Sequence, residues 1–248
     1  MKKLVVIYYH DIVEKGKGYS YQKVEKEHFE SQMKYLKENG YHSILFEDME
    51  KPLPEKAVLV TFDDGFHSVY ENAVPIMERY DIKGNIFLPT KYIEEQDPHF
   101  MRWEMLKTLC DSGEFSVAAH THDHVDIRTL DSEALNLQIQ QSEELLEKRL
   151  GLCTNGFCMP YGKYDHKSIE NLKKSGKYKF IFASFYGHAK EKNLMGHLLP
   201  RIGISNDDSL EIFEKKIHGN LNWKGPIQKI RLQLENWKGE RITQYDIE

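Results

Sequence analysis

The stretch VLVTFDDGFHS, residues 58–68, places two adjacent aspartates directly after a short apolar run. The run has the composition of a buried β-strand, which Thr61 and Phe62 extend. Asp63 and Asp64 therefore stand at the end of a predicted strand, where two like charges repel each other unless a positive charge lies near them. The stretch itself contains no lysine or arginine, so the compensating charge has to come from another part of the fold.

Strand and helix patterns alternate on both sides of this stretch, which favours a largely parallel sheet covered by helices. The fold class is therefore α/β. We favour a closed or nearly closed barrel over an open sheet, although the spacing of the elements does not distinguish them. Strands are predicted near 4–9, 42–45, 57–62, 84–89, 114–120, 155–160, 178–185 and 197–204, and helices near 29–40, 68–80, 103–113, 131–151, 167–175 and 209–217.

Polar motifs follow several of these predicted strands. YYHDI follows the first strand, TFDDG lies at the end of the strand near 57–62, and AAHTHDH and CMPYG end two later strands. In parallel barrels the chemistry lies at the carboxyl ends of the strands. We therefore expect these motifs to meet in one site.

Three histidines occur within five residues in HTHDH, residues 120–124. Neutral imidazoles together with a carboxylate suit a divalent ion such as zinc, and three protein ligands leave a coordination position open. In a continuing strand, His120, His122 and His124 share one face. If the strand ends at His120 and the chain turns, His120 and His124 can converge while His122 points elsewhere. The spacing leaves both arrangements open.

The motifs TFDDG, HTHDH and MPYG, in this order, resemble the polysaccharide deacetylase superfamily, carbohydrate esterase family 4. HTHDH fits H-[S/T]-x-x-H, and the resemblance extends from about residue 4 to residue 219. YYHDI, FESQMKYLKENGY and the segment around Trp103 look like the branch that contains poly-N-acetylglucosamine deacetylases. The resemblance implies a distorted (β/α) barrel of about seven parallel strands with surrounding helices. It also implies metal-dependent removal of an N-acetyl group from an amino sugar.

The two aspartates receive different roles from this resemblance. It implies that Asp64, His120 and His124 bind a divalent metal ion, for which Zn²⁺ is the expected identity. It implies that Asp63 is the catalytic base. A divalent ion lowers the pKa of a bound water and polarises the carbonyl, while the base takes the proton as the water attacks.

The third motif departs from the family pattern R-x-P-[Y/F], because Cys158 stands where the family has the arginine that orients the base. Pro160 and Tyr161 are retained, and the resemblance implies that the Tyr161 backbone N–H helps to hold the oxyanion. Arg201, in the predicted strand HLLPRIGI, is our candidate to reach the base from another direction. We interpret Cys158 as a buried structural thiol and not as a nucleophile.

The general acid that protonates the leaving amine is not evident in the expected motif. His197 begins a predicted strand instead of ending it, and His218 follows a helix. His10 ends the first predicted strand and is the better-placed histidine, either contacting substrate or assisting proton transfer. We therefore include His10 among the catalytic candidates with Asp63 and Arg201.

Composition excludes several classes of protein. The chain has 248 residues, of which 40% are hydrophobic and 29% charged, with a net charge of -5, so nothing indicates nucleic-acid binding. No apolar run approaches the roughly 20 residues of a membrane-spanning helix. The start MKKLVVIYYHDIV lacks the long apolar segment and cleavage site of a secretory signal, and three cysteines form no disulfide framework. We expect a cytoplasmic protein with a carbohydrate partner and leave its oligomeric state open.

We expect residues 1–219 to form the catalytic domain and residues 220–248 to form a C-terminal extension packed on it. In this extension Ile230, Leu232 and Leu234 alternate with polar residues, which is the periodicity of a strand with one solvent-exposed face. We therefore predict an added strand or a lid there, with an oligomer contact as an alternative.

Three functions remain after these observations. The leading one is a metal-dependent de-N-acetylase of an oligosaccharide, polysaccharide or glycolipid head group. The second is a hydrolase of another non-peptide C–N bond, such as a formamide or ureide. The third is a degenerate carbohydrate-binding module, against which the retention of both Asp63 and Asp64 argues, because a binding module needs neither a base nor a metal with an open position.

Overall fold

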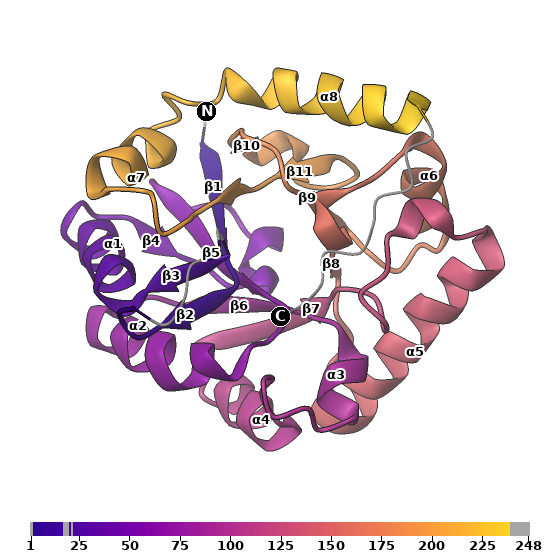
Figure 1. The fold of residues 1–248 in the computed structure, drawn as a ribbon, viewed down its shortest axis with the longest axis horizontal. Coiled ribbons are helices and arrows are strands. Elements are labelled where there is room, and N and C mark those ends of the chain that lie inside the picture. The colour runs from indigo at the N-terminus through magenta and orange to yellow at the C-terminus, as the bar shows by residue number, and fades with distance from the viewer. Residues whose placement is uncertain (1, 17–19, 21, 239–248) are drawn as a thin grey trace.

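The computed structural model describes residues 2–16, 20 and 22–238 of the chain. Seven strands pair in parallel, each with the next along one continuous path, and helices surround them (Figure 1). The predicted α/β barrel of about seven parallel strands is thereby confirmed. In path order the strands are β1 (Lys3–Tyr9), β5 (Ala57–Asp63), β6 (Gly84–Leu88), β7 (Phe115–Ala119), β8 (Gly156–Cys158), β9 (Phe180–Ala183) and β11 (Leu198–Pro200).

The segment 198–203 joins the two ends of this path. Its first half, β11, pairs in parallel with β9, and its second half, β12 (Ile202–Gly203), pairs in parallel with β1. Arg201 lies between the two halves, and its backbone N–H donates to the carbonyl of Ala183 at 3.1 Å. The position of Arg201 is therefore set by the segment that links β9 to β1.

Short strands complete the sheets. β10 (Ala189–Lys190) pairs antiparallel with β1, and β4 (His42–Ser43) pairs in parallel with β5. A separate two-stranded sheet consists of β2 (Asp11–Val13) and β3 (Lys23–Glu25). The strand predicted near 42–45 is thus present, but shorter.

The helices lie on the outside of the barrel (Figure 1). α5 begins after Asp131, whose side chain accepts a hydrogen bond from Ala134 N–H, and ends at Gly151 with a φ of 71°, as the sequence predicts. None of the helices in the described part of the chain is both long and apolar enough to cross a bilayer. The helices are α1 (Lys26–Glu38), α2 (Val74–Tyr80), α3 (Thr90–Glu94), α4 (Trp103–Asp111), α5 (Ser132–Leu150), α6 (His166–Lys174), α7 (Leu210–Ile217) and α8 (Lys224–Lys238).

Side chains alternate between two hydrophobic clusters along each central strand. In β5, Val58, Val60 and Phe62 belong to one cluster, which includes the buried faces of the helices. Ala57 and Leu59 belong to the other, smaller cluster. Because side chains alternate along a strand, Thr61 and Asp63 follow Leu59 on its face. The strand periodicity thus directs Asp63 toward the same side as the smaller cluster.

The strand predicted in the C-terminal extension is wrong. Residues 224–238 form helix α8, and the last ten residues of the predicted extension, 239–248, lie outside the described residues. Leu232 and Leu234 do not share one face of this helix: Leu234 is exposed, whereas Leu232 is only partly so. Asn236 and Gln228 fix α8 to the rest of the molecule, since the Asn236 side chain donates to the Tyr164 carbonyl and the Tyr186 N–H donates to Gln228 Oε1.

Candidate active site and metal centre

The candidate site lies where β5, β7 and β8 end. Asp63 is the last residue of β5, and Asp64 follows it with a φ of 70°, while its N–H donates to the carbonyl of Phe87 on β6 at 3.0 Å. This left-handed conformation is unfavourable for a residue with a Cβ. It lets the chain turn at once, so two neighbouring carboxylates enter different surroundings.

The same strained conformation recurs across the site. Seven described non-glycine residues have a positive φ, and four of them come from the sequence motifs: Asp64, Thr121, His124 and Tyr161. Backbone strain of this kind persists where the surrounding structure enforces it and concentrates at functional sites. Its clustering on four motif residues supports a shared function for them.

Asp64, His120 and His124 converge on one point. Asp64 Oδ1 lies 3.7 Å from His120 Nε2 and 3.3 Å from His124 Nε2, and the three ligand atoms lie within 4.8 Å of one another. Asp64 Oδ1 is buried and has no hydrogen-bond partner among the described atoms. A buried carboxylate oxygen without a partner is costly, and a cation bound at this point removes that cost.

The electrostatics of the three groups also fit a cation. Burial lowers the pKa of His120 to about 3 and that of His124 to about 4, so both imidazoles keep a free lone pair at neutral pH. His120 Nδ1–H donates to the Cys158 carbonyl at 2.9 Å, which leaves Nε2 facing Asp64. Burial raises the pKa of Asp64 to about 6, so the ionised form of this carboxylate is disfavoured unless a cation lies beside it. The donor set and its surroundings therefore fit a divalent metal.

His122 does not belong to this group. Its Nδ1 is hydrogen bonded to Thr90 Oγ1 at 2.9 Å, and its backbone N–H donates to Gln138 Oε1 at 3.0 Å. Gln138 Oε1 also accepts from the Asp123 N–H, so a side chain from α5 fixes the turn between the two converging histidines. The structure thus selects the second of the two arrangements that the spacing allows.

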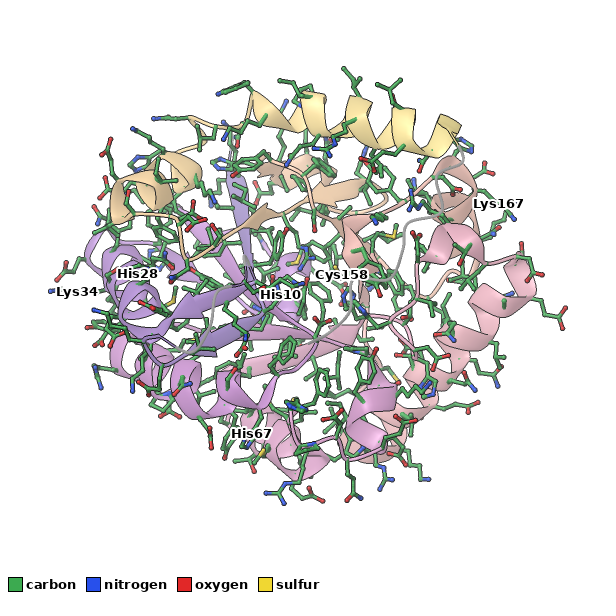
Figure 2. All side chains as sticks on the ribbon, viewed as in Figure 1. His10, His28, Lys34, His67, Cys158 and Lys167 are labelled. Atoms are coloured by element: carbon green, nitrogen blue, oxygen red, sulfur yellow. The ribbon has the colours of Figure 1, made fainter. Side chains whose placement is uncertain are left out.

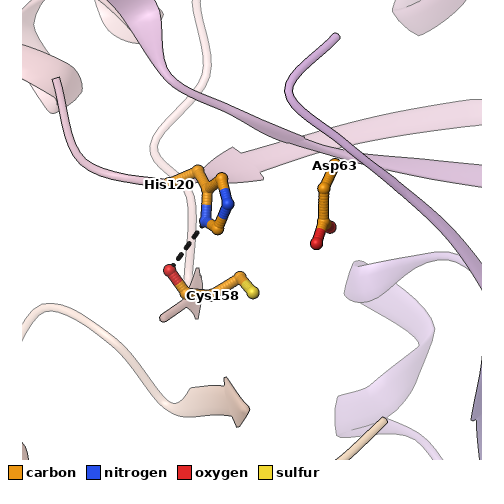
Figure 3. A group of neighbouring side chains, drawn as sticks. All are labelled: Asp63, His120 and Cys158. Carbon is orange, nitrogen blue, oxygen red and sulfur yellow. Dashed lines mark hydrogen bonds between the residues drawn. The ribbon is translucent and has the colours of Figure 1, made fainter. Parts of the chain in front are cut away.

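A second set of potential ligands is Asp63, His120 and Cys158, drawn in Figure 3. Burial raises the pKa of the Cys158 thiol well above its usual range, so the thiolate form that binds metals is disfavoured. Both oxygens of Asp63 are already bound to the Arg201 guanidinium. A metal ion at this point would therefore lie beside a fixed positive charge, and the Asp64 set fits a metal better.

Arg201 orients Asp63. Its Nη1 donates to Asp63 Oδ1 at 2.6 Å and its Nη2 donates to Oδ2 at 2.8 Å. The two side chains thus form a buried, bidentate ion pair. Burial by itself raises the pKa of Asp63, but the guanidinium outweighs it and holds the pKa at about 2. Asp63 is therefore ionised at neutral pH and fixed in direction. The contact expected of Arg201 is present.

The rings of Tyr8 and Phe87 enclose the Arg201 guanidinium, whose Cζ lies 4.5 Å and 5.1 Å from their centroids. Cys158 is completely buried, as predicted, and its small side chain lies in the same interior. Nothing in the sequence indicates the two aromatic contacts, because Tyr8 and Phe87 both look like ordinary strand residues.

His10 lies beside the base. Its Nε2 is 3.9 Å from Asp63 Oδ2, and it borders a cavity of about 260 Å³ that Arg201 also lines. In Figure 2, His10 and Cys158 both lie within the ring of strands, whereas Lys34 and Lys167 lie at the periphery. The structure therefore brings His10 together with Asp63, as its position at the end of the first strand predicts.

Tyr161 lies against His124, one member of the metal-binding group. The short helical turn Pro160–Gly162 gives Tyr161 a φ of 58°, and its ring centroid is 4.6 Å from that of His124. The Tyr161 hydroxyl donates to the His124 carbonyl at 3.2 Å, and Pro160 is buried. Both residues thus adjoin the centre, and the oxyanion role of the Tyr161 N–H stays a prediction.

Comparison with known proteins relates the chain to a family. A family model described as polysaccharide deacetylase matches residues 50–180, more than half of the chain. A Bacillus subtilis protein assigned to the polysaccharide deacetylases is 31% identical over 180 residues, which is 70% of this chain and 62% of that protein. The chain therefore spans less than two thirds of the length of that relative.

Two further proteins extend the similarity over most of the chain. The poly-β-1,6-N-acetyl-D-glucosamine N-deacetylase of Staphylococcus aureus is 29% identical over 230 residues, covering 86% of this chain and 77% of that protein. The crystal structure of a polysaccharide deacetylase from Bacillus cereus superposes with a TM-score of 0.75 at 27% identity, covering 87% of this chain and 69% of that one. The resemblance seen in the motifs is thereby confirmed, and the chain belongs to the polysaccharide deacetylase family.

Proposed function

We propose that this chain is a metal-dependent hydrolase that removes N-acetyl groups from an amino sugar within an oligosaccharide, polysaccharide or glycolipid. The observation that carries the proposal is that two adjacent carboxylates have different surroundings. Asp63 is held by a guanidinium and ionised, whereas Asp64 faces two neutral histidines with an oxygen that lacks a partner. Hydrolysis of an amide needs both an ionised base and an electrophilic centre, and the two carboxylates match these needs.

Asp64, His120 and His124 would hold the metal, and two imidazoles with one carboxylate suit Zn²⁺. When bound there, a divalent ion supplies Lewis-acid chemistry, which polarises a carbonyl and makes water a stronger nucleophile at neutral pH. Asp63 takes the proton from the attacking water through one of the oxygens that Arg201 orients. The Tyr161 backbone N–H donates to the developing oxyanion.

His10 completes the reaction by delivering a proton to the departing amine. Its Nε2 lies 3.9 Å from Asp63 Oδ2, so the proton acceptor and the proton donor lie beside each other. The similarity to a poly-β-1,6-N-acetyl-D-glucosamine N-deacetylase supports an N-acetylated glucosamine polymer as the first substrate to test.

The test measures acetate release from N-acetylglucosamine oligomers of increasing length, together with the metal content of the same protein. We expect acetate release with zinc bound, and loss of that release in Asp63→Asn while zinc is retained. Asp64→Asn should lose both. Release of formate or ammonia from other amides, with no acetate, would favour hydrolysis of a different C–N bond, and a zinc-loaded protein inert toward every amide would contradict the proposal.

A further inference from the structure

Helix α8 presents its apolar side chains outward. Trp223, directly before the helix, and Ile227, Ile230 and Leu234 within it are 61%, 56%, 57% and 54% exposed. Their spacing of four, three and four residues aligns them along one face of a helix. We call these four residues the α8 stripe. Eight large apolar side chains are exposed in the described part of the chain, so half of them gather in this one stripe.

Polar contacts hold the opposite face of α8 to the barrel. Gln228 Oε1 accepts from the Tyr186 N–H at 2.8 Å, and Asn236 Nδ2 donates to the Tyr164 carbonyl at 3.0 Å. Lys229 Nζ lies 4.0 Å from the centroid of the Phe185 ring. A helix on the surface of a globular protein normally buries its apolar side and exposes its polar side. In α8 the apolar stripe is exposed, and Gln228 and Lys229 are exposed as well, so the outer face is suited to contact something apolar.

The charge of α8 restricts what that contact can be. The sequence 224–238 contains four basic residues and one acidic residue, and the acidic one, Glu235, is already paired with Arg231 at 3.1 Å. Lys224 and Arg231 are seven residues apart, so they lie on one flank of the stripe. An apolar face that contains tryptophan and isoleucine beside basic residues is the pattern of helices that lie in the interface of an anionic membrane.

A second copy of the chain fits this face less well. If two α8 helices pack antiparallel about a two-fold axis, each flank faces its own copy, and a flank that carries Lys224, Arg231 and the single carboxylate of Glu235 meets a second flank with the same net positive charge. In a parallel pair the basic flank faces the opposite flank, where Pro226 and Gln233 offer no negative charge. Neither pairing neutralises the excess of basic over acidic residues on α8, whereas anionic lipid does.

We infer that the α8 stripe docks the protein onto a membrane surface that carries anionic lipid, lying in the interface without crossing the bilayer. The same helix contributes Gln228 to the wall of the cavity that His10 and Arg201 line. Docking through α8 therefore places this cavity close to the lipid surface. The inference rests on the surface of α8 and stands whether or not the proposed deacetylation is correct.

The test is co-sedimentation of the full chain with vesicles of phosphatidylcholine, with and without phosphatidylglycerol. We expect binding to the vesicles that contain phosphatidylglycerol, and weakening of this binding as salt is added. The double variant Ile227→Ser with Ile230→Ser should bind at least about tenfold more weakly, because each isoleucine loses the free energy of leaving water. Leu137→Ser is the matched control: Leu137 on α5 is 53% exposed and lies outside the stripe. It should bind like the unchanged protein.

Circular dichroism and thermal unfolding confirm that each variant is folded. The inference is overturned if the unchanged chain does not sediment with vesicles that contain phosphatidylglycerol, or if the double variant sediments equally well. It is also overturned if the chain is a dimer in solution that the double variant dissociates, because a second copy then covers the stripe. Binding that begins only after deletion of residues 239–248 overturns it too, since the stripe is then covered within the full chain.

Discussion

Arg201 holds both carboxylate oxygens of Asp63, at 2.6 Å and 2.8 Å, although 138 positions separate them in the sequence. The segment that links β9 to β1 carries the arginine, while β5 carries the aspartate. Cys158, at the position where the family motif has an arginine, is completely buried in the same interior. A guanidinium thus reaches the base from a different strand, and the smaller side chain at 158 is compatible with that approach.

Replacing Arg201 tests this arrangement. We expect Arg201→Met to lower kcat by about 100-fold, because the base loses its orientation, while zinc content is unchanged. Removing the guanidinium also leaves burial as the main influence on Asp63, so the pKa of Asp63 rises and the acid limb of the pH–rate profile moves to higher pH. Acetate release measured across pH, with zinc measured in the same samples, checks both effects.

A buried carboxylate that loses its partner costs about 3–5 kcal/mol, so Arg201→Met needs a companion that folds more readily. Arg201→Lys keeps the positive charge but cannot bind both oxygens in the same plane. The kcat of Arg201→Lys should lie between that of the unchanged protein and that of Arg201→Met. Full activity in Arg201→Met would show that Asp63 does not depend on Arg201.

His122 and His124 lie in the same motif, but only His124 belongs to the metal group, so the effects of replacing them on zinc binding can be compared directly. His124→Ala should weaken zinc binding by more than about 100-fold, because a direct ligand is lost and even indirect contacts are worth 10–100-fold. His122→Ala should change zinc affinity only a few-fold, since His122 contacts Thr90 and not the metal group. Calorimetric zinc titration of both variants distinguishes them. Equal losses would place His122 among the ligands.

Much of the site could be predicted because it depends on local order. Asp63 is the last residue of a strand, Asp64 and the histidines come after strand ends, and parallel strands bring their carboxyl ends to one edge. The choice between His122 and His124 could not be made, since it depends on the turn that Gln138 fixes from another helix. Arg201 was only a candidate, because no local pattern indicates which long-range strand lies next to Asp63.

Helix α8 was predicted incorrectly for a physical reason. Over Ile230, Leu232 and Leu234 the apolar residues alternate as in a strand, and this short window hides the longer spacing that starts at Trp223. The usual rule assumes that apolar residues point to the core. In α8 the apolar face points outward, so the spacing of its apolar residues does not indicate a face that packs on the core.

Removing the metal gives a stability prediction with a definite sign. In the metal-free protein, burial raises the pKa of Asp64 from 3.8 to about 6. Since the folded-state pKa lies above the unfolded one, the stability from protonated Asp64 is fully present below about pH 4 and is lost as the pH rises through about 6. Asparagine cannot ionise, so Asp64→Asn should stabilise the metal-free protein at neutral pH by about 3 kcal/mol.

Urea unfolding in the presence of a chelator measures this difference. The two proteins should have similar free energies of unfolding near pH 4 and should diverge as the pH rises. Zinc should then stabilise the unchanged protein and have little effect on Asp64→Asn. A variant that is no more stable than the unchanged chain at neutral pH, without metal, would contradict the assignment of Asp64 as an unsatisfied buried carboxylate.

We expect the Cys158 thiol to be unreactive and to take no part in catalysis. Its side chain is completely buried, and burial raises the pKa of its thiol well above the usual range. Iodoacetamide should therefore leave acetate release unchanged, and Cys158→Ala should keep most of the activity at a stability cost of about 1 kcal/mol. Mass spectrometry after labelling shows which cysteines react, and the exposed Cys153 is the internal positive control. Inactivation that follows modification of Cys158 would require a direct role for the thiol.

The role of His10 can be tested through the leaving group. If His10 protonates the departing amine, its loss matters for an amide and much less for an activated ester, whose leaving group departs without a proton. We expect His10→Gln to lower kcat on N-acetylglucosamine oligomers by about 100-fold but to lower hydrolysis of 4-nitrophenyl acetate only a few-fold. Asp63→Asn is the control and should impair both reactions, because each needs the water to be activated. Equal losses on both substrates in His10→Gln would instead assign His10 to substrate positioning or to support of Asp63, from which it lies 3.9 Å.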